Sequence, residues 1–207
     1  MYCAAPAQAY AEATRKTDIL ALQSGEPGPI AQVIAGVDLA LWDLCARRAS
    51  LPLFRLLGGQ QARLPVNASG INPDGPLAVV QRKHAEGYPA FKLQIGFSAQ
   101  QDLDHLASLR AWLGPQAQQI RQHGRRYCLH YLGAGIGLRA SAHVMAAAGG
   151  DGLLEIDAND NALRSLLAPP LAQVVDGYIS LEEKPGLGVT PDIEALKRAC
   201  AALSADA

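Results

Sequence analysis

The hydrophobic pattern of the chain changes its period near residue 60. Before that point, apolar residues recur at three- and four-residue steps, which is typical of amphipathic helices. The clearest pattern predicts a helix over 29–49, where Pro29 suits a first helical position and one face carries Ile30, Val33, Ile34, Val37, Leu41 and Leu44. Asp38 and Asp43 interrupt this helix, and we expect solvated or capping roles for them. A helix over 6–22 and a helical turn over 51–59 flank it.

From Leu64 onward, short apolar strands alternate with helices. The expected strands are 64–70, 90–96, 127–132, 153–157 and 177–184, and the expected helices include 73–87, 98–113, 116–124, 163–168 and 191–203. In the helix over 98–113 we expect four leucines to point inward, namely Leu103, Leu106, Leu109 and Leu113. Strands and helices that alternate at this spacing favour βαβ units and a parallel sheet.

The segment 126–159 reads as strand, glycine turn, helix, glycine turn and strand. His130 lies near the end of the first strand and Glu155 lies in the second. Because the carboxyl ends of parallel strands open on the same face, we expect these two side chains to share one mouth. Lys92 lies in the middle of the strand 90–96, where an ammonium group is costly unless it is paired or extends to the sheet rim.

The glycine turn has a second interpretation. The pattern Gly135-x-Gly137-x-x-Ala140 follows a strand and opens a helix, and an acidic residue lies about 20 positions on, which is similar to a dinucleotide fingerprint. Two strands precede it, however, whereas the fingerprint normally follows the first strand of its sheet. NAD(P) binding is therefore an alternative hypothesis.

Composition narrows the class of protein. Of 207 residues, 49% are hydrophobic and 18% charged, as in a well-cored globule of one domain or one domain with an appendage. A net charge of −1 gives no reason to expect nucleic acid as a partner. No run approaches the roughly 20 apolar residues of a membrane span, and the first residues lack a signal-peptide pattern. We interpret the four scattered cysteines, Cys3, Cys45, Cys128 and Cys200, as reduced residues of a cytoplasmic protein.

Four stretches together resemble the mandelate racemase and muconate lactonizing branch of the enolase superfamily. AGVDLALWDLCARRASLPLFRLLGG resembles the segment that joins that family's capping domain to its barrel, and AEGYPAFKLQIG resembles the second barrel strand. CLHYLGAGIGLRASAHVMAAAGG followed by LLEIDAN resembles the seventh and eighth strands, and EEKPGLGVTPD resembles the C-terminal return to the capping domain.

The resemblance implies an α/β fold, a partial TIM-type (β/α) barrel with strands similar to 1, 2, 7 and 8 of the family. We expect remnant capping-domain and linker helices over 1–59, the partial barrel over 60–176 and a C-terminal return segment over 177–207. The family abstracts a proton alpha to a carboxylate and uses Mg²⁺ to stabilise the resulting enediolate. The resemblance therefore implies an acid-sugar dehydratase or a racemase that acts on a small carboxylate or acid sugar.

The resemblance also implies three catalytic residues. Lys92 matches the first lysine of a Lys-x-Lys motif on the second strand, whereas the second lysine, the usual base, is Gln94 here. An amide cannot accept the proton at neutral pH. His130 matches the histidine base of the seventh strand, and Glu155 matches the eighth-strand glutamate that hydrogen-bonds the developing enolate.

The chain is too short for the rest of that site. A TIM barrel takes about 250 residues, but only 37 residues separate Lys92 from His130. The strands that carry the family's metal carboxylates are absent, and Asp102 and Asp104, on a predicted helix, cannot replace them. We therefore expect no metal ligands and a catalytically inactive form. A non-catalytic remnant or an assembly module is the alternative, with homo-oligomers forming through open barrel edges.

Overall fold

The computed structural model describes residues 5–113, 128–131, 133–168, 171 and 173–205. The elements in chain order are α1 (Ala5–Ser24), α2 (Pro27–Arg48), α3 (Leu53–Leu56), β1 (Arg63–Ile71), α4 (Pro76–Ala85), β2 (Phe91–Leu93), α5 (Ala99–Leu113), α6 (Gly135–Ala148), β3 (Leu154–Asp157), α7 (Ala162–Leu166), β4 (Tyr178–Ser180) and α8 (Ile193–Ala205). The expected alternation of strands and helices after residue 60 is confirmed. The helix expected over 116–124 lies outside the described residues.

The sheet has the order β2-β1-β3, and these three strands are parallel. On the far side of β3, His130 forms a parallel bridge with Glu155. Within the strand expected over 127–132, the described residues 128–131 form one bridge, at His130. Tyr127 and Leu132 lie outside the described residues.

The fourth strand departs from the expected parallel sheet. β4 runs antiparallel to β1 and pairs with Arg63, Leu64 and Pro65. These residues precede Val66, where pairing with β3 begins. The first three residues of β1 therefore extend beyond its pairing with β3, and β4 pairs with them as the chain returns toward the N-terminal helices.

The two faces of the sheet differ in polarity. Val66 and Ala68 of β1 belong to the main core, together with Leu154 and Ile156 of β3. Helices α4 and α6 cover this face with Val80, Leu138, Ala142 and Met145. Since side chains alternate along a strand, Asn67 and Ser69 lie on the opposite face, and their register partners there are Glu155 and Asp157.

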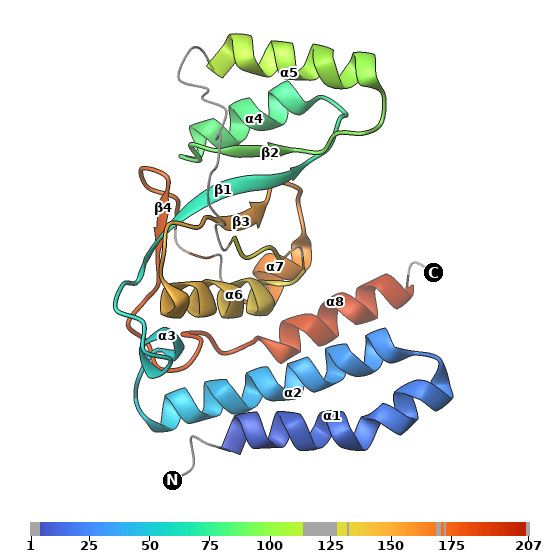
Figure 1. The fold of residues 1–207 in the computed structure, drawn as a ribbon, viewed down its shortest axis with the longest axis vertical. Coiled ribbons are helices and arrows are strands. Elements are labelled where there is room, and N and C mark those ends of the chain that lie inside the picture. Colours follow the sequence, from blue (N-terminus) through green and yellow to red (C-terminus); the bar gives the residue numbers. More distant parts are fainter. Residues whose placement is uncertain (1–4, 114–127, 132, 169–170, 172, 206–207) are drawn as a thin grey trace.

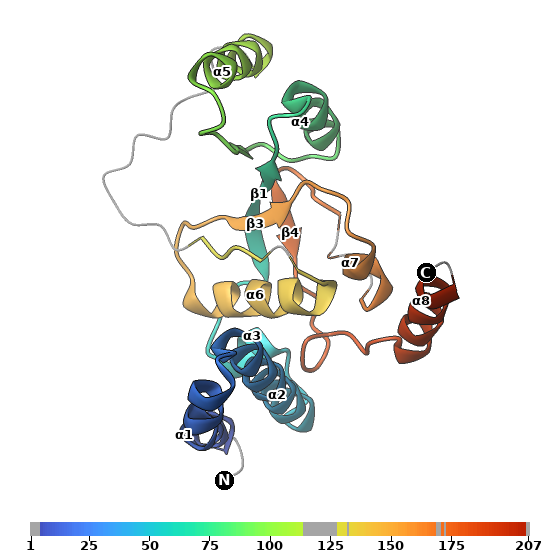
Figure 2. The same cartoon turned by 90° about the vertical axis from the view of Figure 1, so that its right-hand side faces the viewer.

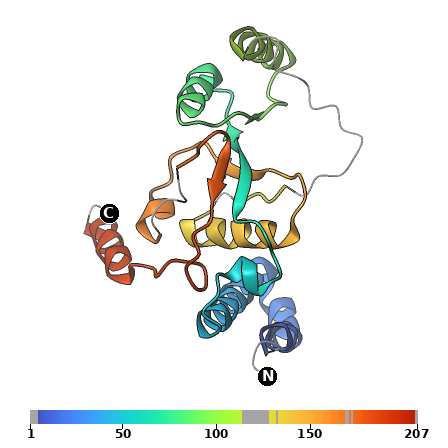
Figure 3. The same ribbon diagram turned by 90° about the vertical axis from the view of Figure 1, so that its left-hand side faces the viewer.

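The helices lie around this sheet in groups (Figure 1). α4 and α5 lie at the β2 end, α6 and α7 lie beside β3, and α1, α2 and α3 lie beyond α6. In the projection of Figure 1, α8 is drawn close to α2, but Figures 2 and 3 show that the two helices lie apart.

The inward orientation expected for four leucines of α5 is confirmed for two of them and wrong for the other two. Leu109 is buried and Leu113 packs against the core, but Leu103 and Leu106 are 62% and 46% exposed. Within the described part of the chain, α5 packs mainly on α4. One side of the helix is therefore left without cover.

The C-terminal loop joins the N-terminal helices to the rest of the molecule. Asp43 Oδ1 of α2 accepts a hydrogen bond from the Leu187 amide at 2.6 Å, and Asp43 Oδ2 pairs with Arg47 at 2.7 Å. The backbone amide of Leu53 donates to the Gly186 carbonyl at 2.8 Å. The expectation that Asp43 is solvated or caps a helix is therefore wrong. Its carboxylate accepts a hydrogen bond from a loop amide.

Helix α2 also corrects the expectation that no segment is long and apolar enough for a membrane span. By length and composition alone, α2 meets that criterion. Its apolar window is only 11% buried, and it carries Asp43 and Arg47, both hydrogen-bonded to the C-terminal segment.

His143 of α6 is the buried histidine of this junction. It is 1% exposed, and its Nδ1 accepts a hydrogen bond from the Phe54 amide at 3.1 Å. Burial lowers the pKa of His143 to about 4, although a hydrogen bond to the Leu187 backbone and the charge of Asp43 partly oppose this effect. The imidazole is therefore neutral in the folded protein at neutral pH.

We expect folding stability to fall as the pH drops from about 6.5 to about 4. In this range the unfolded state binds a proton at His143 that the folded state does not, so the loss approaches roughly 3 kcal/mol by linkage. Urea denaturation between pH 4 and 7 measures it. His143→Gln should flatten the pH slope, whereas the control His84→Gln, on the exposed side of α4, should keep it. Equal slopes in wild type and His143→Gln would contradict this account.

Candidate active site

The polar face of the sheet converges on one carboxylate. Lys92 Nζ of β2 lies 2.9 Å from Glu155 Oε2 and 3.2 Å from Oε1. Ser69 Oγ of β1 donates to Oε2 at 3.0 Å, and His130 Nδ1 lies 2.6 Å from the same oxygen. Glu155 of β3 therefore receives groups from the neighbouring β1, from β2 beyond β1, and from the His130 bridge on its other side.

Burial and charge explain the state of Glu155. Its side chain is 12% exposed, whereas those of Lys92 and His130 are 48% and 38% exposed. Burial alone raises the pKa of a carboxyl group, but the hydrogen bonds and charge from Lys92, together with Ser69 and His130, hold the pKa of Glu155 below its usual range. Glu155 is therefore ionised and accepts from His130 Nδ1–H, so that in a neutral imidazole Nε2 is the acceptor nitrogen of the ring.

The structure brings together all three residues singled out from the sequence. His130 and Glu155 share one mouth, as expected, and the ammonium of Lys92 is paired rather than solvated at the rim. Sequence reasoning missed Ser69, which is fully buried, and Asn67, which is 7% exposed. A signal was present, since these are the two polar residues of the strand expected over 64–70, and their spacing of two puts them on one face.

A magnesium site of the family type does not fit the described residues. They contain no group of three His, Cys, Asp or Glu side chains placed to hold a metal ion. The two carboxylates at the mouth are already neutralised, Glu155 by Lys92 and Asp157 by Arg164 at 2.9 Å. By sequence, residues 114–127 contain no aspartate or glutamate. Among the described residues, this site therefore offers no free set of the oxygen ligands that Mg²⁺ prefers.

The space beside the glycines in the first turn of α6 is filled by the protein's own atoms. A Cβ atom at Gly137 would overlap the ring of Tyr131, and one at Gly135 would overlap the backbone carbonyl of Arg164. In a dinucleotide site the glycines leave room for the pyrophosphate. Here they make room for an aromatic ring and for α7, which argues against the NAD(P) hypothesis.

Comparison with known proteins agrees with this geometry. Residues 4–58 match the mandelate racemase / muconate lactonizing enzyme N-terminal domain family, and residues 116–196 match the enolase C-terminal domain-like family. A solved mandelate racemase/muconate lactonizing enzyme from Bordetella bronchiseptica is 38% identical, with a TM-score of 0.85 over 94% of this chain and 81% of that one. The chain belongs to the mandelate racemase/muconate lactonizing enzyme family of the enolase superfamily, which confirms the resemblance seen in the sequence.

Two further relatives indicate the range of the family. The 3,6-anhydro-alpha-L-galactonate cycloisomerase of Streptomyces coelicolor is 38% identical over 96 residues, which are 44% of this chain and 27% of the relative. The L-talarate/galactarate dehydratase of Salmonella typhimurium, solved with Mg and L-lyxarohydroxamate, shares the fold with a TM-score of 0.63 at 17% identity, over 78% of this chain and 64% of that one. The chain thus spans about a quarter of the curated cycloisomerase that it matches.

We expect Lys92→Met to raise the pKa of Glu155, because burial then acts against fewer stabilising groups. Carbon-13 NMR of labelled glutamate carboxyl groups during a pH titration measures this change. The matched control is Lys83→Met, which removes an ammonium 2.8 Å from Glu86 on α4 and should leave Glu155 unaffected. An unchanged Glu155 titration in Lys92→Met would contradict the proposed charge pairing.

Gly137→Ala tests the packing of the glycine turn. Alanine in a helix is normally better than glycine by about 0.5–1 kcal/mol, but overlap with Tyr131 should make this change destabilising by about 1–3 kcal/mol. In a Tyr131→Ala background the same substitution should become neutral or stabilising. A double-mutant cycle by urea denaturation measures the sign change, and equal effects in both backgrounds would disprove the contact.

Proposed function

We propose that this chain carries the proton-transfer part of an acid-sugar dehydratase or cycloisomerase site and that it is catalytically silent as it stands. The observation that carries the proposal is the convergence of Lys92, His130 and Ser69 on Glu155. A histidine whose Nδ1–H is held by a carboxylate presents Nε2 as a general base. The ammonium of Lys92 can stabilise negative charge on a nearby substrate carboxylate.

The role of Glu155 in this proposal differs from the sequence expectation of an enolate hydrogen-bond donor. An ionised carboxylate has no proton to donate, and the pKa of Glu155 is held low by its neighbours, which outweigh its burial. Glu155 therefore orients His130 and anchors Lys92. Donation to a substrate oxygen falls to Lys92, whose side chain is 48% exposed.

The silence of the site follows from its charge balance. Removal of a proton alpha to a carboxylate concentrates two negative charges on the enediolate, and the family stabilises them with Mg²⁺. Among the described residues, the one ammonium paired with Glu155 is that of Lys92, and Glu155 already neutralises it. Acid sugars or other small carboxylates are the ligand class that we propose, by relation to the cycloisomerase and dehydratase relatives.

We also propose that β2, β1, β3 and the His130 bridge are strands 2, 1, 8 and 7 of a TIM-type barrel. Their order, their common direction and a polar inner face opposite an apolar helix-covered face support this assignment. In this assignment residues 1–59 are remnant capping and linker helices, 60–176 are the half barrel, and 177–207 are the return segment.

Hydrogen exchange at the substrate alpha carbon tests the proposed silence. Proton NMR in D₂O with galactonate and millimolar Mg²⁺ should detect neither alpha-proton loss nor dehydration above the level of His130→Asn. Exchange in the wild type that disappears in His130→Asn would overturn the proposal and establish a working enzyme.

A second copy of the chain is the partner that we propose for the open sheet. β2 has β1 on one side and no strand among the described residues on the other. In the described part of the chain, the two outer edges belong to one parallel sheet, so the β2 edge of one copy can continue into the His130 edge of another with the strand direction kept. Five exposed apolar side chains follow β2, namely Ile95, Phe97, Leu103, Leu106 and Trp112.

Sedimentation velocity tests this association. The wild type should sediment as a dimer or larger species, and Phe97→Lys should shift it to the monomer, because a charge at the edge opposes burial. The control Leu22→Lys changes an even more exposed residue on α1, 84% exposed against 64% for Phe97, and should leave the association intact. A strictly monomeric wild type would refute the proposed pairing.

A further inference from the structure

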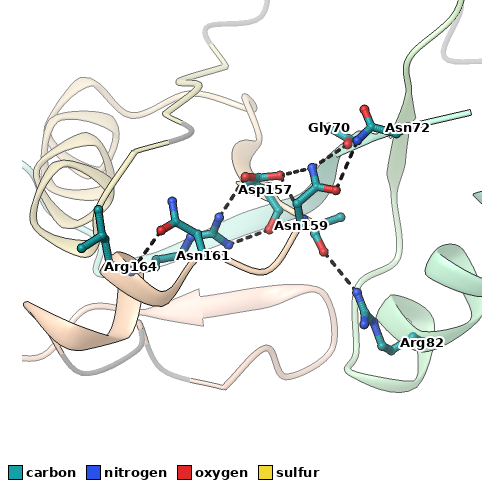
Figure 4. A network of polar contacts seen from close by, with 9 residues as sticks. Gly70, Asn72, Arg82, Asp157, Asn159, Asn161 and Arg164 are labelled. Carbon is teal, nitrogen blue, oxygen red and sulfur yellow. Dashed lines mark hydrogen bonds and ion pairs between the residues drawn. The ribbon is translucent and has the colours of Figure 1, made fainter. Parts of the chain in front are cut away.

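A second polar cluster lies at the carboxyl end of β3, next to the Glu155 site (Figure 4). Arg164 of α7 donates to the Asp157 carbonyl at 2.8 Å and to its Oδ2 at 2.9 Å. Asn159 donates to Asp157 Oδ1 from its backbone amide at 3.0 Å and from its side-chain Nδ2 at 2.8 Å. The Asp157 carboxylate is 8% exposed, and both of its oxygens are occupied.

This cluster is tied to β1 at two consecutive residues. The Ala158 amide donates to the Ser69 carbonyl at 2.7 Å, and Asn159 Nδ2 donates to the Gly70 carbonyl at 2.9 Å. Gly70 has a φ of +71° and a Cβ built on it would lie 2.9 Å from Asp157 Oδ1. Only glycine allows both this backbone conformation and this approach. The residues that follow β3 are thus hydrogen-bonded to the backbone of β1 at Ser69 and Gly70.

The amide of Asn159 can be oriented in one way only. Its Nδ2 faces two acceptors, the Gly70 carbonyl and the Asp157 carboxylate, so the oxygen must point away from both. Arg164 fixes Asp157 in turn, and Asp157 fixes Asn159. The chain of contacts runs from Arg164 through Asp157 and Asn159 to Gly70, and it ends next to the Ser69 hydroxyl that donates to Glu155.

We propose that Asn159 is a positioning residue. By holding the Gly70 carbonyl, it directs the Ser69 hydroxyl toward Glu155. The position of the Glu155 carboxylate in turn orients His130. This inference rests on the proposed proton-transfer role of the Glu155 site. Asn159 itself touches none of Lys92, His130 and Glu155 through a hydrogen bond in the described structure. Its influence passes through the β1 backbone.

The titration of the Glu155 carboxyl group, followed by carbon-13 NMR, separates positioning from a purely structural role. Ser69→Ala deletes the hydroxyl and should raise the pKa of Glu155. Asn159→Ala should raise it in the same direction, toward the Ser69→Ala value, and in Ser69→Ala it should have no further effect. The control Asn72→Ala removes an exposed amide at the same cluster, 3.5 Å from Asn159 Oδ1, and should change nothing.

If Asn159→Ala does not fold, Asn159→Ser is the variant to measure. A serine side chain can still reach Asp157 but is too short to reach the Gly70 carbonyl. A Glu155 titration unchanged in both Asn159 variants, with a shift in Ser69→Ala, would overturn the positioning role and leave the proposed function standing. An unchanged titration in Ser69→Ala would overturn the positioning role as well. Failure of the proposed function would instead appear as His130-dependent turnover, which this titration does not measure.

Discussion

The structure of the site depends on one largely buried carboxylate. Glu155 is costly to bury as an anion, and it is kept ionised by an ammonium, a hydroxyl and an imidazole that come from the elements on both sides of β3. These contacts are possible only if β2, β1 and β3 keep their order and their register. A shift of one residue in β3 would turn Glu155 to the helix-covered face. The same carboxylate therefore specifies the sheet and orients the histidine.

Much of this could be predicted from the sequence, because it follows local rules. The period of apolar residues located most helices and strands, and the shared face of parallel strand ends brought His130 to Glu155. The failures were non-local. The antiparallel β4 arises from the length of β1 relative to its neighbours, and the exposure of Leu103 and Leu106 arises from the absence of cover over α5 in the described chain. Periodicity identifies an apolar face but not whether another element covers it.

Two of the polar residues that were not predicted from the sequence, Ser69 and Asn159, act on another side chain or on the backbone. Ser69 matters because of its register with β3, and Asn159 because it reaches the Gly70 carbonyl. The glycines in the first turn of α6 were misleading for a related reason. Their pattern is similar to a nucleotide turn, but the space that they provide is occupied by Tyr131. The spacing of the glycines shows that something must pack closely against the helix there, but only the fold shows that the group is the Tyr131 ring.

We propose that, within its family, the chain keeps the groups that handle a proton and lacks, among the described residues, those that hold a metal ion. That separation is the central claim, and a thermal melt with and without Mg²⁺ tests it most directly. A site of micromolar affinity would stabilise the protein by about 4 kcal/mol at millimolar Mg²⁺. The account predicts an unchanged melting temperature relative to a matched concentration of NaCl. A saturable rise with Mg²⁺ that is lost in Glu155→Gln would contradict it.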